Sequence, residues 1–463
     1  MNQRKITPLA RPPPYRSPKG AVVTGRPVDV TAALADRRRY ERQIERLHHR
    51  HLHTGRLYEI RQDAVTLASV VMHSGRVARA LARDVARGRY VLEPGELRTI
   101  RVRDKLREVY TCRLTDLIVH GVVAEIVREA TAPALSARVY SYRPGTSWAE
   151  PVTRFAGWLR AHRRAEPDPL RRGVYVLRGD VDSYTDSIPL LPGSPVWSML
   201  EHHLGAPLHP LVVDVVRPRL RTRDGIARRD RGLPMGQPIA PVLANLYLGA
   251  LDTLLAAEPD GFSARYGDDF LFAHPDPGTF AAAVAGTAAV LDGLAMTVNE
   301  TKRRIVYLTP AGRPAPDGVP ATGAPDVTFL GARIRADGTV GLDRAKVRGL
   351  LRDVDRRAAA TAATVRPAPR EAVGRAVCAA VNHALRPRTG IAEQRSANLL
   401  RAVVTDREQL RQLDHRIAGI VASAVTGRRG PRAFRDVPYR RLREDWGLRS
   451  LVVARNAHGG GRG

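Results

Sequence analysis

Three acidic residues stand where β-prone runs end or turn, and they constrain the fold of this chain more than any other feature. Residues 174–177 form a short apolar run that leads to Asp180, and residues 262–272 are β-prone on both sides of Gly267-Asp268-Asp269. The pattern predicts a buried strand that ends in an acid and a hairpin with two acids at its tip. Carboxylates in such places repel one another and raise one another's pKa unless a cation neutralises them.

A divalent cation is the partner that this chemistry favours. Mg²⁺ binds a few carboxylates together with phosphate oxygens. Two such ions, roughly 3.5–4 Å apart, support in-line displacement at phosphorus. The alternative is that each acid is an exposed turn residue, because Gly-Asp is a common turn dipeptide. For an isolated Gly-Asp-Asp that alternative would prevail, so the catalytic interpretation depends on further motifs.

The remaining periodicity predicts a mixed helix and strand chain. Arg98 to Thr111 alternates and predicts a strand pair that turns at Asp104-Lys105. Residues 304–307 and 327–334 each predict a strand, and the Pro/Gly-rich residues 309–326 between them predict a loop. Helices are expected over the following ranges: 30–60, 65–90, 114–129, 239–256, 280–291, and most of the chain from 340 onward.

The charge of the chain favours a polyanionic partner. The 75 Lys and Arg residues exceed the 46 Asp and Glu residues by a net charge of +29, and only five of the basic residues are lysines. Residues 340–463 hold 26 basic and 11 acidic residues, a net charge of +15. Nucleic acid is the first candidate, with a solvated basic surface or an anionic membrane surface as the alternatives.

The compartment is expected to be reducing and cytoplasmic. Two cysteines, Cys112 and Cys378, are too few for a disulfide framework or a cysteine-rich zinc module. No apolar signal segment is visible near the N-terminus. The longest apolar stretch, residues 239–257, is interrupted by Pro241 and Asp252, and it reads as a buried helix with no membrane partner.

Seven segments resemble motifs of one enzyme family. GDVDSYTDSIP around Asp180 resembles the first catalytic motif of reverse transcriptases, and YGDD at 266–269 resembles their YxDD motif. In addition, GLPMGQPIAPVLANLYLGALD (232–252) is similar to the second motif, and LAMTVNETKRRIVYL (294–308) is similar to the fourth. The short segment FLG (329–331) is similar to the primer-grip hairpin. Two upstream segments, KLREVYTCRLTDLIVH (105–120) and SYRPGTS (141–147), are similar to the fingers motifs of bacterial and group II intron enzymes. All seven follow the family's order over residues 95–335, and the ordered set is far more specific than any member.

The resemblance implies a role for each matching residue. The catalytic set would be Asp180, Asp268, Asp269 and Lys302, with Lys302 near the leaving pyrophosphate as a cation or proton donor. A surface lysine at a helix–strand corner is the alternative for Lys302. Two Mg²⁺ ions, for which Mn²⁺ can substitute, would be bound by the carboxylates of Asp180, Asp268 and Asp269 and by the backbone carbonyl of Val181. The residues expected beside the incoming nucleotide are Lys105, Arg107, Tyr184, Thr185, Met235 and Gln237.

The family also implies a fold and partners. The expected fold class is α+β, a right-hand polymerase with fingers, a palm built on an antiparallel sheet with packed helices, and a helical thumb. The expected partners are an RNA template, a nucleic-acid primer and dNTPs, with a dedicated non-coding RNA as a further possibility and no protein partner specified. The expected boundaries are a basic Pro-rich arm at 1–28, a helical extension at 29–94, fingers at 95–172, palm at 173–338, and a basic thumb with a C-terminal extension at 339–463.

Two positions depart from the family pattern. Met235 stands where the second motif usually has a Gln that contacts the nucleotide, and Gln237 is the candidate substitute. Thr185 stands where a Phe or Tyr usually blocks a ribose 2′-OH, with Tyr184 one place earlier. The departure at Met235 puts ordinary nucleotide handling in question, and the departure at Thr185 predicts looser sugar selection.

Several functions therefore stay open. The leading one is a reverse transcriptase of the group II intron-like, retron-like or defence-associated bacterial type, in a retroelement or phage-defence system. The alternatives are an RNA-dependent RNA polymerase, an untemplated nucleotide polymerase, and an RNA-binding maturase with reduced polymerase activity. Thr185 argues against the RNA polymerase, which usually has a second Asp at that position.

Overall fold

The computed structural model describes residues 28–52, 61–62, 65–102, 105–168, 172–316, 319–386 and 396–453, and only the backbone of Arg61, Gln62, Val102 and Lys105. These residues combine helices with strands, as expected for an α+β chain. The predicted arm at 1–28 lies almost wholly outside the described residues, as does Asp104 of the predicted turn. The chain divides into two compact units, one of residues 1–144, 179–257 and 283–302 and one of residues 145–178, 258–282 and 303–463.

The first unit begins with helices at the positions that the periodicity predicts. They are α1 (Val30–Ala35), α2 (Arg37–Leu52), α3 (Leu67–Met72), α4 (Ser74–Ala86) and α5 (Leu114–Thr131). The predicted strand pair is confirmed as β3 (Glu96–Val102) and β4 (Lys105–Thr111), which pair antiparallel with Ile100 opposite Arg107. α5 is buried along almost its whole length because its residues are apolar on every face.

Glu125 of α5 anchors α2. Its carboxylate accepts hydrogen bonds from Arg42 at 2.7 Å, Gln43 at 2.7 Å and Arg39 at 3.2 Å, and a further one from Arg46. Burial alone would raise the pKa of Glu125, but the hydrogen bond from Arg42 and the charges of Arg46 and Arg42 lower it. A buried charge that three arginines neutralise, and to which Gln43 adds a hydrogen bond, therefore fixes α2 to α5.

Shorter elements complete the first unit. They are β1 (Arg61–Gln62), β2 (Val65–Thr66), α7 (Tyr184–Ser187), α8 (Pro195–Leu204), α9 (Pro210–Val216), β6 (Arg219–Thr222), β7 (Gly225–Arg228), α10 (Ala240–Tyr247) and α11 (Gly249–Ala256). The single helix predicted over 239–256 is wrong, because the backbone leaves helical geometry at Leu248. Gly249, a poor helix former, begins the second helix at this break.

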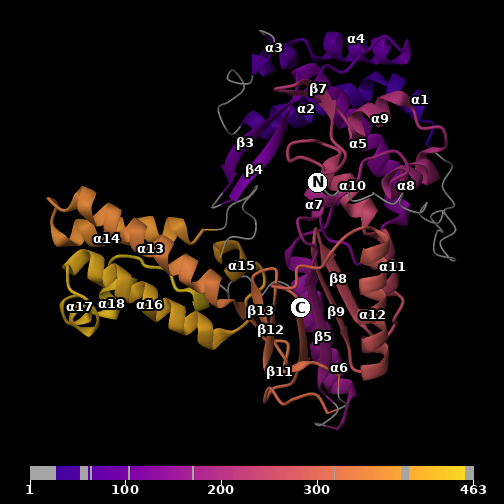
Figure 1. The fold of residues 1–463 in the computed structure, drawn as a ribbon. Coiled ribbons are helices and arrows are strands. Elements are labelled where there is room, and N and C mark those ends of the chain that lie inside the picture. Colours follow the sequence, from indigo (N-terminus) through magenta and orange to yellow (C-terminus); the bar gives the residue numbers. More distant parts are fainter. Residues whose placement is uncertain are drawn as a thin grey trace, which may run out of the picture. The chain divides into compact units, whose positions relative to one another are not determined.

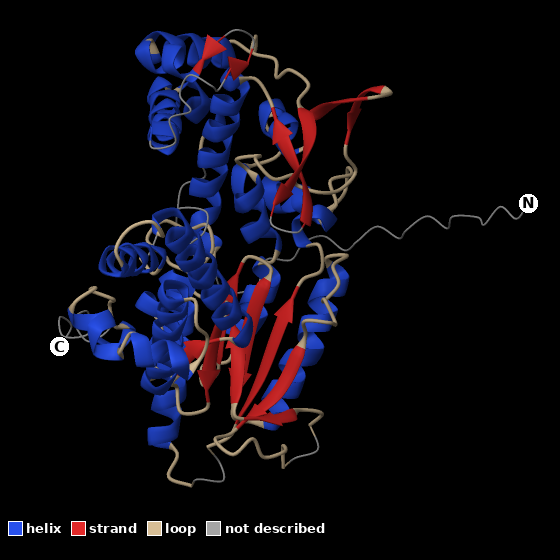
Figure 2. Ribbon diagram, turned by 90° about the vertical axis from the view of Figure 1, so that its left-hand side faces the viewer, coloured by secondary structure: helices blue, strands red, loops and turns tan. Residues whose placement is uncertain are grey.

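The second unit is organised around a five-stranded sheet, whose strands run side by side in Figures 1 and 2. Its order is β11 (Thr322–Ala324), β10 (Arg304–Leu308), β5 (Val174–Asp180), β9 (Asp269–His274) and β8 (Phe262–Tyr266). β5 is antiparallel to β10, and β8 is antiparallel to β9 as the hairpin pattern predicts. Helix α6 (Ala149–Ala165) packs on β8 through Phe155, whose ring centroid lies 5.1 Å from that of Phe262. Helix α12 (Pro277–Gly293) follows β9 and confirms the predicted helix.

Two predictions between residues 309 and 334 are wrong. Residues 322–324 are not loop but form β11, which pairs parallel with β10. The backbone at Gly323 also passes close to Arg313, and an added Cβ there would lie 2.3 Å from the carbonyl oxygen of Arg313. Residues 327–334 are not one strand but parts of β12 (Asp326–Phe329) and β13 (Ala332–Arg335). Leu330 and Gly331 have φ angles of 50° and 80° and turn the chain between them.

The basic C-terminal region is helical, as predicted, after a short strand β14 (Val340–Leu342) that pairs with β13. Its helices are α13 (Arg344–Val365), α14 (Arg370–Ala384), α15 (Ser396–Ala402), α16 (Arg407–Thr426), α17 (Pro431–Asp436) and α18 (Tyr439–Glu444). α13, α14 and α16 pack against one another, and Figure 1 shows them side by side. None of the described helices in the chain is both long and apolar enough to cross a membrane.

Candidate active site

Asp180 is the last residue of β5, and its charge is balanced by Lys302. The strand reaches Asp180 through Val174, Tyr175 and Val176, which are all buried. The Asp180 side chain is 8% exposed, and its Oδ1 accepts a hydrogen bond from Nζ of Lys302 at 2.7 Å. Asp180 and Lys302, both of which the motifs assign to catalysis, are therefore in direct contact.

The backbone around Lys302 fixes this contact. The amide of Asn299 donates to the carbonyl of Asp180 at 2.7 Å, and the amide of Asp182 donates to the carbonyl of Thr297 at 2.9 Å. Val181, between these bonds, is buried and forms a bridge with Val298. Residues 297–299 thus continue antiparallel pairing beyond the end of β5, which places Lys302 next to Asp180.

Asp269 belongs to the hairpin of the second unit, and Arg178 binds it. The Nε atom of Arg178 lies 3.2 Å from Oδ1 of Asp269, and Nη2 lies 3.3 Å from Oδ2. Both side chains are mostly buried, and this fork-to-fork geometry is the strong form of the Arg–carboxylate pair. Sequence analysis missed Arg178, although its place two residues before Asp180 was the available signal.

The buried side chain of Arg265 supports the turn at the tip of the hairpin. Gly267 has a φ of 68°, and its carbonyl accepts a hydrogen bond from Nη1 of Arg265 at 3.0 Å. Arg265 is 2% exposed. Asp268 follows Gly267 in the turn and is partly exposed. A buried guanidinium therefore holds the turn that presents Asp268.

The ligand atoms that these acids could offer a metal ion are carboxylate oxygens, the kind that Mg²⁺ prefers. Among the described residues, no three His, Cys, Asp or Glu side chains gather closely enough to hold a metal ion on their own. One oxygen of Asp180 is engaged by Lys302, whereas both oxygens of Asp269 are engaged by Arg178. The donor chemistry fits a cation at Asp180 better than at Asp269.

β4 carries the predicted triphosphate-binding residues. The Arg107 side chain is 42% exposed and lies 3.8 Å from a carboxylate oxygen of Asp186 in α7. Lys105 is the first residue of β4, but its side chain lies outside the described part of the chain. Arg107 is therefore a partly exposed cation next to the segment that follows Asp180.

The Tyr184 and Thr185 side chains have different environments. Tyr184 is buried, and its hydroxyl donates to the carbonyl of Ala244 in α10. The Tyr184 ring thus packs in the core, and its predicted contact with a nucleotide stays a prediction. Thr185 is half-buried, and its carbonyl accepts a hydrogen bond from the amide of Leu233 at 2.8 Å.

The Gly-Pro-rich loop at 232–237 packs beside β4. The carbonyl of Met235 accepts a hydrogen bond from the amide of Tyr110 at 2.7 Å, and its side chain is 45% exposed. Gly236 has a φ of 89°, and an added Cβ would lie 2.9 Å from the carbonyl oxygen of Tyr110. Gln237 is buried and donates from Nε2 to the carbonyl of Val215 at 2.6 Å. The Gln237 amide thus binds within the core, and its predicted replacement of the missing nucleotide contact stays a prediction.

A buried histidine lies under β4. The ring centroids of Tyr110 and His120 are 5.4 Å apart, and the Tyr110 hydroxyl lies 3.4 Å from Nε2 of His120. Burial lowers the pKa of His120 to about 4. His120 is therefore a neutral support of this strand.

Comparisons with known proteins show only distant similarity to solved structures. No protein-family model and no curated protein matches the sequence. Similar solved structures include apo telomerase from Candida tropicalis truncated from its C-terminal domain, with 13% identity, a TM-score of 0.40, and 55% of this chain and 56% of that chain covered. Telomerase from Candida albicans in complex with the TWJ fragment of telomeric RNA has 13% identity and a TM-score of 0.41, with 73% of this chain and 61% of that chain covered. The match thus spans less than two thirds of either telomerase chain, and the function is inferred from the residues of this chain.

Proposed function

We propose that this chain is a nucleotidyltransferase of the reverse-transcriptase type, which extends a primer on an RNA template with dNTPs. One observation carries the proposal: Arg178 of β5 binds Asp269 of the neighbouring strand β9, and Asp180 follows two residues later in β5. Asp269 thus begins the strand that neighbours β5, and Asp180 is the last residue of β5 itself.

The proposal requires that Asp180 and Asp268 bind the same pair of Mg²⁺ ions. When bound, these ions would lower the pKa of the primer hydroxyl and neutralise the triphosphate. Asp180 and Asp268 are the proposed ligands, with the carbonyl of Val181 as a further oxygen donor. Asp269 is assigned a supporting role, because Arg178 engages both of its oxygens.

The cations of the chain would act on the triphosphate. Lys302 is placed by its backbone next to Asp180, so it can leave that carboxylate for a phosphate oxygen without a change of fold. Arg107 offers a partly exposed guanidinium, the group best matched to phosphate. The net charge of +15 over residues 340–463 would hold the template and primer through their phosphates, without reading sequence.

Ribonucleotide or untemplated synthesis is the second candidate. The observation that favours it is the burial of Tyr184, which leaves the smaller Thr185 as the partly exposed residue of this pair. The exposed Met235 and buried Gln237 add to it, because neither reproduces the missing Gln. A bacterial retroelement or phage-defence setting is proposed from the motifs, and sequencing of the nucleic acid that co-purifies with the protein tests it.

Primer extension with the Asp268→Asn variant tests the proposal. Wild-type protein with Mg²⁺, a primed RNA template and dNTPs should extend the primer, and the variant should lose this activity while RNA binding stays within about twofold. Asp260→Asn, an exposed acid just before the same hairpin, is the matched control and should remain active. Unchanged extension by Asp268→Asn would refute the assignment, and extension with rNTPs alone would favour the second candidate.

A further inference from the structure

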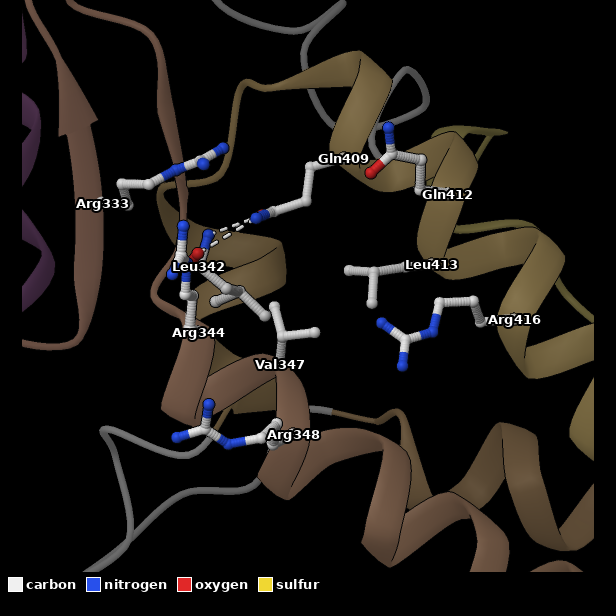
Figure 3. A pocket seen from close by; sticks show the side chains of 9 residues that line it. All are labelled: Arg333, Leu342, Arg344, Val347, Arg348, Gln409, Gln412, Leu413 and Arg416. Atoms are coloured by element: carbon white, nitrogen blue, oxygen red, sulfur yellow. Dashed lines mark hydrogen bonds between the residues drawn. The ribbon is translucent and has the colours of Figure 1, made fainter. Parts of the chain in front are cut away.

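A pocket in the second unit lies between the start of α13 and the first turns of α16. Its volume is about 270 Å³, near the lower end of the roughly 300–1,000 Å³ that small-ligand pockets span. In Figure 3, Leu413 and Arg416 of α16 point from one wall toward Leu342 and Val347 on the other. The lining residues are Arg333, Leu342, Arg344, Val347, Arg348, Gln409, Gln412, Leu413 and Arg416.

The charge of this pocket is unbalanced. Arg333 is the only one of its four arginines with an ion pair to a described residue, a contact of 2.9 Å with Asp406. Within the described part of the chain, Arg344, Arg348 and Arg416 have neither an ion pair nor a hydrogen bond from the side chain. Three guanidinium groups around one pocket repel one another, and a multiply charged anion would relieve that repulsion.

The rest of the lining suits more than a bare phosphate. Leu342, Val347 and Leu413 give the pocket an apolar surface between its arginines. Gln409 uses both amide atoms on the backbone of Leu342, at 2.6 and 3.0 Å, so its role is structural. Gln412 is exposed and its Nε2 donates to Glu408 at 3.1 Å, so its amide oxygen is the group it offers to the polar edge of a base. Apolar and guanidinium surfaces together are the surroundings on which nucleobases stack.

We propose that this pocket binds a nucleoside phosphate, with the phosphate between Arg344 and Arg416 and the base against the apolar surface. The ligand is either one unstacked nucleotide of a single strand or a free nucleotide, because both offer the same chemistry. The pocket lies mostly in the basic region 340–463 that is proposed to hold the template and primer, and it adds to that proposal a discrete site for one nucleotide, none of whose lining residues belongs to the catalytic motifs.

Titration of the full chain with adenosine 5′-monophosphate, in EDTA to remove divalent cations, tests the proposal. The double variant Arg344→Ala/Arg416→Ala should bind at least about tenfold more weakly, because each arginine offers a charge-assisted, bidentate contact. Arg357→Ala is the matched control. Arg357 is exposed and lies on another face of α13, away from Arg344 and Arg348, so this variant should bind as wild type. Inorganic phosphate should bind at least tenfold more weakly than the nucleotide. Asp268→Asn should also bind as wild type, which separates this site from the polymerase assignment.

Competition identifies the source of the nucleotide. A hexamer of riboadenylate that displaces the monophosphate at lower concentration identifies a single strand, and one that fails to displace it identifies a free nucleotide. Equal affinity of the double variant and the wild type, equal affinity for inorganic phosphate, or displacement by a hexaglutamate peptide at the same concentration would each overturn the proposal. Circular dichroism should show the same melting for the wild type, the double variant and Arg357→Ala, since Arg344, Arg357 and Arg416 are all exposed.

Discussion

The Nζ atom of Lys302 lies 2.7 Å from Oδ1 of Asp180, and the two side chains differ sharply in exposure. The carboxylate is 8% exposed, whereas the lysine is 45% exposed. A buried anion thus relies on a cation that solvent and ligands can reach. Any phosphate that attracts Lys302 would free the Asp180 oxygen for another partner, so the two events are coupled.

Replacing Lys302 by Ala should lower the rate of single-nucleotide incorporation by about 10²–10⁴-fold, the usual contribution of a positioned proton donor. Lys302→Arg should recover part of this loss if charge matters more than proton transfer. Arg304→Ala removes a positive charge two residues away, and it should retain near wild-type activity. Rapid-quench kinetics on a primed template measures the effect, and equal rates for Lys302→Ala and Arg304→Ala would contradict the role given to Lys302.

Arg178 and Asp269 should contribute to nucleotide incorporation as a coupled pair. Arg178→Ala and Asp269→Asn are each expected to reduce incorporation by about tenfold, and the double variant should lose little more, because coupled residues are not additive. Arg304 lies opposite Arg178 on β10, so Arg304→Ala is a matched cross-strand control. A double variant whose loss is the product of the two single losses would show that Arg178 does not act through Asp269.

Thr185 should set the sugar preference. Thr185→Phe places a ring at this position, and the ratio of dNTP to rNTP incorporation should rise by at least about tenfold. Thr185→Ser keeps the side chain small and should leave the ratio near the wild-type value. Competition between matched dNTP and rNTP in single-nucleotide extension gives the ratio. A wild-type enzyme that already rejects rNTPs strongly would contradict this prediction.

His120 should make the protein less stable in mild acid. Its folded pKa of about 4 lies below the ordinary histidine value of ~6.5, so the unfolded chain takes up a proton first as the pH falls. The free energy of unfolding should therefore decrease between pH ~6.5 and about 4, by at most ~1.4 kcal/mol per pH unit from this residue.

Urea denaturation at several pH values measures this dependence. His120→Gln should reduce the slope, whereas His202→Gln, at an exposed position, should leave it unchanged. Part of the slope should persist in His120→Gln, because burial also lowers the pKa of His162, His203 and His209. Equal slopes in the wild type and His120→Gln would mean that His120 is not the neutral, buried group described above.

Binding to a primed RNA template should weaken steeply with salt. The affinity is expected to fall linearly on a double-logarithmic plot, with a slope set by the number of neutralised phosphates. Replacing an arginine that contacts one phosphate should reduce the slope by about one. Fluorescence anisotropy at several salt concentrations gives the slope. A slope near zero would rule out phosphate contacts as the basis of binding.

The elements with strong periodicity were predictable. The helix at 114–129 and the hairpin at 262–272 occur as the pattern indicates, because long apolar runs and alternating strands depend little on distant contacts. The break at Leu248 was not predictable from an apolar run that continues through it. β11 also escaped prediction, because its pairing with β10 is a contact between separate segments.

The candidate site was predictable in its acids but not in its support. Asp180 and Lys302 were identified from motifs, and the structure shows a contact between them that the motifs did not predict. Arg178 is one of 70 arginines, and its place two residues before Asp180 was the only local signal for it. The inward orientations of Tyr184 and Gln237 depend on α10 and on the segment around Val215, and no sequence pattern gives a side-chain direction.

The neutralisation of Glu125 by side chains of α2 decides how the chain can be shortened. A variant that starts at residue 95 would lose Arg39, Arg42 and Arg46 together with the helices that pack on α5, and it would expose the apolar face of α5 that they cover. Such a variant should misfold or aggregate even though it retains every catalytic motif. The leading helices are thus a structural prerequisite of the catalytic segments rather than a detachable accessory.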